Sequence, residues 1–180
     1  MECGPGGMKM AQATIVKQGV LIADPTQNMA SLIAAMLRGF GHQMVTEITE
    51  ARAFSGALLR RSYALIIVDE SLGASGPLAT LRKLRSDPSH PNRFTPIIMV
   101  SAAPDIRSIS EARDAGVSEF LRKPFSAADL QARIAGLDLK PRDFVIAPDY
   151  AGPDRRRRQV DIGPSDQRGE GSDDPEPTEN

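Results

Sequence analysis

Four polar side chains stand where apolar, strand-like runs of the chain end. These residues are Asp24, Asp69, Ser101 and Lys123. The clearest run is residues 65–68, four large apolar residues directly before Asp69. A strand buried on both faces has such a continuous apolar run, and open α/β folds place their ligands at the carboxyl ends of parallel strands. We therefore expect the four side chains to lie together at one edge of a sheet.

The residue types in this group point to phosphoryl chemistry. Two carboxylates and a backbone carbonyl form the hard-oxygen ligand set that suits Mg²⁺. A hydroxyl and an ammonium beside them can bind the oxygens of a phosphoryl group, and a carboxylate can accept that group as an acyl phosphate. Taken alone, Asp69 could equally cap the turn indicated by residues 71–77. Four strand-like runs that each lead into one of these polar residues favour the phosphoryl site over a simple turn cap.

Apolar spacing predicts five strands that alternate with five helices. The strands are expected at residues 19–24, 44–47, 65–69, 96–101 and 118–122. Helices are expected to begin at or just after Thr26, Thr49, Asp105 and Ser126, and Leu78, Leu81 and Leu84 mark a further helix between the third and fourth strands. Right-handed crossovers then give an α/β, flavodoxin-like fold, a parallel five-stranded sheet of order 2-1-3-4-5 with helices on both faces. Asp24 and Asp69 are expected to meet at the topological switch point of this sheet, where the first and third strands lie side by side and the strand order reverses.

Length and composition bound the organisation of the chain. With 180 residues, 41% of them hydrophobic, we expect one domain at 19–138 after a flexible leader at 1–18. Prolines and glycines interrupt every period beyond it, so residues 139–180 are predicted to be a disordered tail, with an arginine-rich segment at 149–163. The single Cys3 excludes a disulfide framework, and no membrane-spanning run is present, which favours the cytoplasm and no membrane partner.

Several segments resemble the CheY-like receiver domain of two-component response regulators. They are residues 20–24, 66–69, 98–102 and 114–125. The resemblance covers residues 19–137 and implies that Asp69 is the phosphoacceptor. It further implies that Asp24, Asp69 and the carbonyl of Ser71 bind Mg²⁺, and that a histidine kinase or phosphotransfer protein is a partner.

The same resemblance assigns the remaining receiver positions. Ser101 and Lys123 would contact the phosphoryl group, and Phe120 would take the place of the switching aromatic residue. Ala23 stands where the family usually has a second acidic residue at the end of the first strand. A receiver that kept the fold without control by phosphate is therefore an alternative hypothesis.

Four consecutive arginines, Arg155, Arg156, Arg157 and Arg158, are the second informative feature. A solvated basic patch in a disordered tail is the simplest interpretation of such a run. Three details favour a ligand instead: the run contains no lysine, Tyr150 lies five residues upstream, and the flanking residues are acidic. Guanidinium forks, a carboxylate and phosphate-binding charge together suit a guanine nucleotide.

The tail resembles that of the CheY-like cyclic di-GMP effectors known as Cle proteins. The resemblance rests on the run Gly-Pro-Asp-Arg-Arg-Arg-Arg, residues 152–158, and on the Arg-x-x-Asp spacing that ends at Asp161. It implies that the four arginines and Asp161 bind cyclic di-GMP, with Tyr150 and Asp154 as further candidates. It also implies a role at the flagellar motor or in surface attachment.

Three functions therefore compete. The first is a non-enzymatic effector whose tail binds cyclic di-GMP and switches a protein–protein interaction. The second is a single-domain phosphorelay regulator with an incidental tail. The third, a binder of nucleic acid polymers, is disfavoured because no aromatic residues interleave with the arginines. A hydrolase is disfavoured because His42 and His90 both lie outside the strand-end group.

Overall fold

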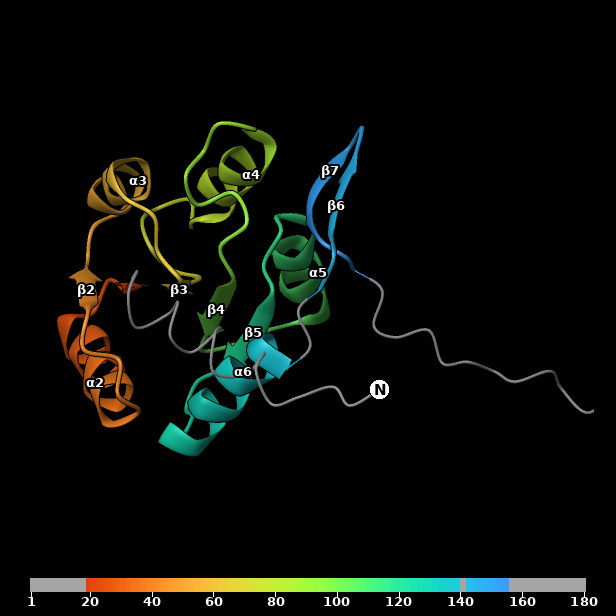
Figure 1. Cartoon of the computed structure of the whole chain (residues 1–180). Coiled ribbons are helices and arrows are strands. Elements are labelled where there is room, and N and C mark those ends of the chain that lie inside the picture. Colours follow the sequence, from red (N-terminus) through yellow and green to blue (C-terminus); the bar gives the residue numbers. More distant parts are fainter. Residues whose placement is uncertain (1–18, 140–141, 156–180) are drawn as a thin grey trace, which may run out of the picture.

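The computed structural model describes residues 19–139 and 142–155. Five parallel strands form one sheet in the order β2-β1-β3-β4-β5 (Figure 1). The strands are β1 (Val20–Ala23), β2 (Val45–Ile48), β3 (Leu65–Asp69), β4 (Ile97–Ser101) and β5 (Glu119–Arg122). The helices are α2 (Gln27–Gly39), α3 (Ala51–Arg60), α4 (Leu78–Ser86), α5 (Ile106–Asp114) and α6 (Ala127–Leu139). The predicted flavodoxin-like fold and its strand order are confirmed.

The helices cover the sheet in two layers. Helices α2 and α6 pack on one face, and α3, α4 and α5 pack on the other (Figure 1). Side chains alternate along each strand, so Leu21 and Ile66 point to the α3–α5 side while Ile22 and Ile67 point to the α2–α6 side. Burial on both faces explains why the central strands are continuous apolar runs. Among the described residues, no helix is both long and apolar enough to cross a bilayer.

Side-chain caps fix the start of two helices. Ser126 Oγ accepts a hydrogen bond from the Asp129 amide at 3.1 Å, and the Asp129 carboxylate accepts one from the Ser126 amide at 2.8 Å. Together these two bonds form a capping box at the start of α6, whose start near Ser126 the sequence predicts. The Asp105 carboxylate caps α5 by accepting from the Ser108 amide at 2.6 Å. Both caps begin helices that flank β5, and so they define the loops on either side of that strand.

The prediction of disorder from residue 139 onward is wrong for a part of the tail. Residues 144–153 form an antiparallel hairpin of β6 (Phe144–Ala147) and β7 (Tyr150–Pro153), and β7 packs against α4 (Figure 1). Its prolines are compatible with strands because they lie in the turn and at a strand end, where no ladder N–H is needed. The predicted leader and residues 140–141 and 156–180 lie outside the described residues.

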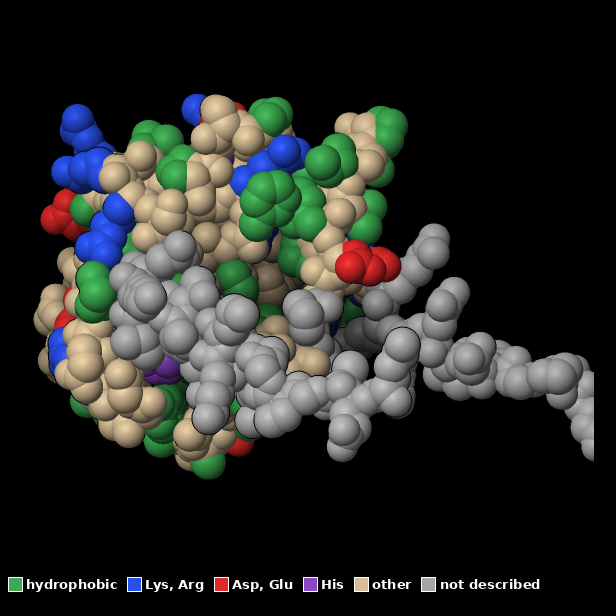
Figure 2. All heavy atoms as spheres, in the orientation of Figure 1, with side chains coloured by type: hydrophobic (Ala, Val, Ile, Leu, Met, Phe, Trp, Pro, Cys, Tyr) green, Lys and Arg blue, Asp and Glu red, His purple; other side chains and the backbone are tan. Residues whose placement is uncertain are grey.

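Tyr150 and Gly152 dock the hairpin on the domain. The Tyr150 side chain is buried, and its hydroxyl donates to the Pro153 carbonyl at 2.6 Å. A Cβ at Gly152 would lie 3.0 Å from Gly116 Cα, so only glycine allows this close backbone approach. Figure 2 shows exposed apolar side chains at this end of the molecule, where Phe94 and Ile146 are each 66% exposed.

A buried arginine supports the loops beneath the hairpin. Arg85, on α4, is 1% exposed, and its guanidinium donates to the Gly116 carbonyl at 3.0 and 3.1 Å and to the Thr95 carbonyl at 2.8 Å. It also donates to the carbonyls of Asn92 and Arg93. Burial lowers the pKa of Arg85 to about 10, so the side chain stays charged at neutral pH. Every one of these acceptors is a backbone carbonyl.

Candidate functional site

Two buried carboxylates share one lysine at the carboxyl edge of the sheet. Lys123 Nζ lies 2.7 Å from Asp24 Oδ2 and 2.6 Å from Asp69 Oδ2. The carboxylates meet because β1 and β3 are neighbouring strands, with Ala23 opposite Val68. Asp24 directly follows β1, and Asp69 is the last residue of β3. Asp24 is 1% exposed and Asp69 4% exposed, so water screens the pairs little. The structure thus brings together three of the four predicted residues in direct contact.

The outer carboxylate oxygens are held by the loops that follow the strands. Asp24 Oδ1 accepts a hydrogen bond from the Thr26 amide at 2.8 Å. Asp69 Oδ1 accepts from the Ser71 amide at 2.8 Å and also from the Ser71 hydroxyl. Asp69 therefore caps its turn and belongs to the charged group at the same time. These bonds orient both carboxylates with their Oδ2 atoms toward the lysine.

The charge of Lys123 is stabilised by its partners. Burial alone would lower the pKa of the ammonium, because a low-dielectric environment disfavours the charged form. The hydrogen bonds and attraction from Asp24 and Asp69 outweigh burial and raise the pKa of Lys123 above its ordinary value. The lysine is therefore a fixed cation at neutral pH, placed where an incoming anionic group would meet the carboxylates.

Ser101 and Phe120 lie on the strands beside this group. Ser101 ends β4 and is buried, and its carbonyl accepts a hydrogen bond from the Lys123 amide at 2.7 Å. This contact holds the lysine backbone against the strand that carries the hydroxyl. Phe120, on β5, is partly buried and packs against the core on the α3–α5 side. Their predicted roles, phosphoryl contact and switching aromatic, stay predictions.

The donor set fits a magnesium ion. Mg²⁺ is commonly bound by one or two carboxylates while it keeps several waters. Asp24 and Asp69 supply two carboxylates, and Ser71 directly follows the β3 end with its carbonyl as the predicted third ligand. The part of the chain that the structure describes contains no group of three or more His, Cys, Asp or Glu residues suited to a metal. An ion here would compete with the Lys123 ammonium for the same oxygens.

The first arginine of the tail is fixed on the hairpin. The guanidinium carbon of Arg155 lies 3.7 Å from the centroid of the Tyr150 ring, and Arg155 Nη1 pairs with Asp114 Oδ1 at 2.8 Å. The ring is buried under this stack, so Tyr150 packs the tail onto the domain and does not present a free face to a base. The Asp154 amide donates to the Asp143 carbonyl at 2.7 Å.

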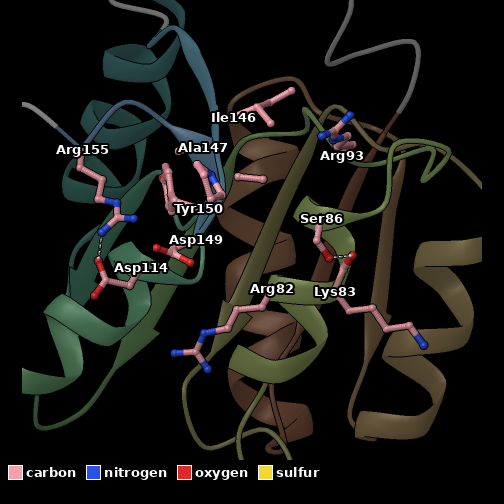
Figure 3. A pocket seen from close by; sticks show the side chains of 12 residues that line it. Arg82, Lys83, Ser86, Arg93, Asp114, Ile146, Ala147, Asp149, Tyr150 and Arg155 are labelled. Carbon is pink, nitrogen blue, oxygen red and sulfur yellow. Dashed lines mark hydrogen bonds and ion pairs between the residues drawn. The ribbon is translucent and has the colours of Figure 1, made fainter.

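The other residues predicted to bind the nucleotide lie outside the described part of the chain. These are Arg156, Arg157, Arg158 and Asp161. The sequence interpretation also missed a cleft between α4 and the hairpin, which Arg82 and Lys83 line together with Arg155 (Figure 3). The hairpin provides one wall of this cleft. A sequence pattern that predicts a disordered tail therefore cannot reveal the cleft.

The comparisons decide the family. The model of the response regulator receiver domain matches residues 20–135. The chain belongs to the response regulator receiver domain family. Matching receiver domains occur in longer proteins: the response regulator protein PmrA of Pseudomonas aeruginosa is 30% identical over 118 residues, 66% of this chain and 51% of PmrA. The sensory/regulatory protein RpfC of Xanthomonas campestris pv. campestris is 27% identical over 133 residues, 74% of this chain but only 18% of RpfC.

A solved receiver domain shows the same fold. The receiver domain of the sensor histidine kinase PA1611 from Pseudomonas aeruginosa superposes with a TM-score of 0.60 and 25% identity. The match covers 68% of this chain and 98% of that domain, whose structure contains a magnesium ion coordinated in the active-site cleft. The unmatched part of this receiver includes the hairpin and the arginine run, since the family model ends at residue 135.

Proposed function

We propose that this receiver accepts a phosphoryl group on Asp69 from a histidine kinase or phosphotransfer protein and signals without turning over a substrate. The observation that carries the proposal is the buried Asp24–Lys123–Asp69 group. A nucleophilic carboxylate, a second carboxylate for a metal and a fixed cation converge at one edge of the sheet. Membership of the receiver family and the magnesium ion in the PA1611 domain support this assignment.

The proposed phosphoryl transfer uses the residues gathered at the carboxyl edge of the sheet. An oxygen of Asp69 forms a bond to the phosphorus of a phosphohistidine while the P–N bond breaks. The bonding electron pair goes to the ring nitrogen, and because the other ring nitrogen carries a proton, the histidine leaves as neutral imidazole. Lys123 offers its ammonium to the phosphoryl oxygens, and the buried Ser101 hydroxyl is the candidate donor on the neighbouring strand. Magnesium held by Asp24, Asp69 and the Ser71 carbonyl would neutralise charge on the transferred group.

Phosphorylation by a small donor tests this proposal. With acetyl phosphate and Mg²⁺, the parent chain should gain one phosphoryl group, and Asp69→Asn should gain none because the amide is no nucleophile. Mass spectrometry of the intact protein measures the difference. Glu70→Gln is the matched control, since it neutralises the adjacent, partly exposed carboxylate and should label normally. A parent chain that stays unlabelled would contradict the proposal.

A second candidate function, binding of cyclic di-GMP by the arginine run, is favoured by a specific observation. The guanidinium carbon of Arg155 lies 3.7 Å from the centroid of the Tyr150 ring, at the edge of a cleft that Arg82 and Lys83 also line, and three further arginines follow it directly in the sequence. This arrangement supplies planar donors for phosphates and guanine edges beside the receiver. In this proposal the nucleotide changes how the receiver docks to a partner, with the flagellar motor switch or a surface-attachment protein as the expected target class.

Replacing Arg156 and Arg157 by alanine is expected to weaken cyclic di-GMP binding at least a hundredfold. Each arginine removed takes away charge-assisted hydrogen bonds of about 1.5–3 kcal/mol. Isothermal titration calorimetry with the full chain measures the loss. The double variant Arg156→Lys, Arg157→Lys keeps the charge but loses the fork, and it should recover only part of the affinity. Unchanged affinity in the alanine variant would contradict the second function.

A further inference from the structure

The hairpin has one edge that pairs with no other strand. β6 and β7 form a two-stranded sheet, and β7 is the strand that packs against α4 (Figure 1). The outer edge of β6 therefore has no strand partner in the part of the chain that the structure describes. The N–H and C=O groups along such an edge are a template for a further strand.

The hydrogen bonds of the hairpin identify the backbone groups on this edge. The Asp154 amide donates to the Asp143 carbonyl at 2.7 Å, which places Asp143 in a bonded pair of the ladder. Bonded residues alternate along an antiparallel strand, so every second residue after Asp143 also bonds to β7. The N–H and C=O groups of Phe144 and Ile146 consequently point to the outer edge.

The side chains of these two residues lie on the face of the hairpin that is turned away from the core. Tyr150 and Gly152 are buried, so their partners on β6 face the domain, and Phe144 and Ile146 face outward. Ile146 is 66% exposed, and the Phe144 ring packs edge-on against the exposed Phe94 ring with their centroids 4.7 Å apart. β6 contains neither a charged residue nor a proline, which are common means of blocking an edge strand.

A second copy of this chain is complementary to the edge. Two β6 strands related by a twofold axis run antiparallel, and pairing Val145 with the second copy's Val145 places Phe144 opposite the second copy's Ile146. Phe144 and Ile146 carry the outward backbone groups, so each of the two symmetric pairs makes two hydrogen bonds. An aromatic side chain opposite a β-branched one adds to the stability of such a strand pair.

The charges at the ends of the strand are complementary in the same register. Arg142 lies opposite the second copy's Pro148, one residue from its Asp149. The Asp149 carboxylate has no hydrogen bond or ion pair with a residue that the structure describes. The twofold axis repeats this approach of opposite charges at both ends of the strand pair, which favours a second copy over an unrelated peptide.

We infer that this chain forms a homodimer through antiparallel pairing of β6, which joins the two hairpins into one four-stranded sheet. The outer face of that sheet carries Phe94, Phe144 and Ile146 of both copies as one apolar cluster. Stable interfaces bury about 1,200–2,000 Å² in total, and strands of this length supply only a part of that area. The dissociation constant is therefore expected in the micromolar range. The dimer requires neither a phosphoryl group nor a nucleotide.

Sedimentation equilibrium of the full chain across the micromolar range tests the dimer. The parent chain should pass from monomer to dimer, and Ile146→Lys should weaken the dimer about tenfold or more, because the twofold axis brings two ammonium groups to the strand pair. Leu59→Lys is the matched control, since it changes an apolar residue of α3 that is 67% exposed, and it should associate as the parent chain does. A monomeric parent chain, or equal association of all three proteins, would overturn the inference.

Cysteine cross-linking in a Cys3→Ser background tests the register. Val145→Cys places two thiols opposite each other, where the Cα atoms of a non-hydrogen-bonded pair are about 4.5 Å apart and a disulfide can form. Ala147→Cys is the control, because its thiol lies opposite the second copy's Asp143, roughly 13 Å along the strands from the other thiol. Mild oxidation should cross-link the first variant much faster than the second. Equal rates would show that the two β6 strands do not pair in this way.

Discussion

Arg85→Met is expected to lower the free energy of unfolding by about 3–5 kcal/mol. Arg85 is buried and its guanidinium satisfies carbonyls on two separate loops, at Thr95 and Gly116 among others. Replacing a buried ion pair by apolar residues need not destabilise a protein when both members of the pair are replaced. Here the partners are backbone carbonyls, which no substitution removes, so methionine leaves them buried without donors. Urea unfolding followed by circular dichroism measures the loss.

Two variants separate this effect from the loss of a positive charge. Arg82→Met removes a charge one turn earlier on α4, where the side chain is exposed, and should change stability by less than about 0.5 kcal/mol. Arg85→Lys keeps the charge but cannot reach loops on both sides with one ammonium, so it should lie between the parent chain and Arg85→Met. If Arg85→Met unfolds at the same urea concentration as the parent chain, the proposed role of the guanidinium is wrong.

Lys123→Met is expected to destabilise the chain by about 2–4 kcal/mol in metal-free buffer. Lys123 bridges Asp24 and Asp69, and without it two buried carboxylates face each other with no cation between them. Magnesium should restore much of the loss because it would occupy the position that the ammonium leaves. Thermal unfolding with EDTA and with excess Mg²⁺ measures both effects.

The size of the magnesium effect decides this prediction. The melting temperature should rise more in Lys123→Met than in the parent chain, where the ammonium competes for the same oxygens. Lys83→Met is the control, because it removes an exposed lysine of α4 and should respond to magnesium as the parent chain does. Equal magnesium effects in all three proteins would show that the ion does not bind between these carboxylates.

The two candidate sites lie on different parts of one receiver. The Asp24–Lys123–Asp69 group is at the carboxyl edge of the sheet, whereas the cleft lined by Arg82, Asp114 and Arg155 lies over α4 and the end of α5. Asp114 ends α5 and pairs with Arg155, and β5 begins five residues later. A ligand that engages Arg155 therefore acts next to the strand that leads to Lys123. The two proposed inputs are compatible in a single chain.

Local sequence patterns were sufficient for the fold and for the strand-end group. Continuous apolar runs predict strands buried on both faces, and a parallel topology places residues that follow such strands at one edge. Asp24, Asp69 and Lys123 were therefore predictable as neighbours, and the structure shows them in contact. The capping box at Ser126 was equally visible, since its two residues lie within one helical turn.

Only the tertiary structure decided the hairpin, the buried arginine and the cleft. Prolines and glycines at 148, 152 and 153 have the composition of a disordered segment, and the close approach of Gly152 to Gly116 reveals why they fit. In the sequence, Arg85 resembles an ordinary residue of a helix surface. Its buried position is explained only by the carbonyls of Thr95 and Gly116, which the fold brings to its guanidinium. These features depend on contacts between residues distant in sequence, and no local period encodes such contacts. The sequence by itself determined the group of polar residues at the strand ends, and the tertiary structure determined how the hairpin packs on α4.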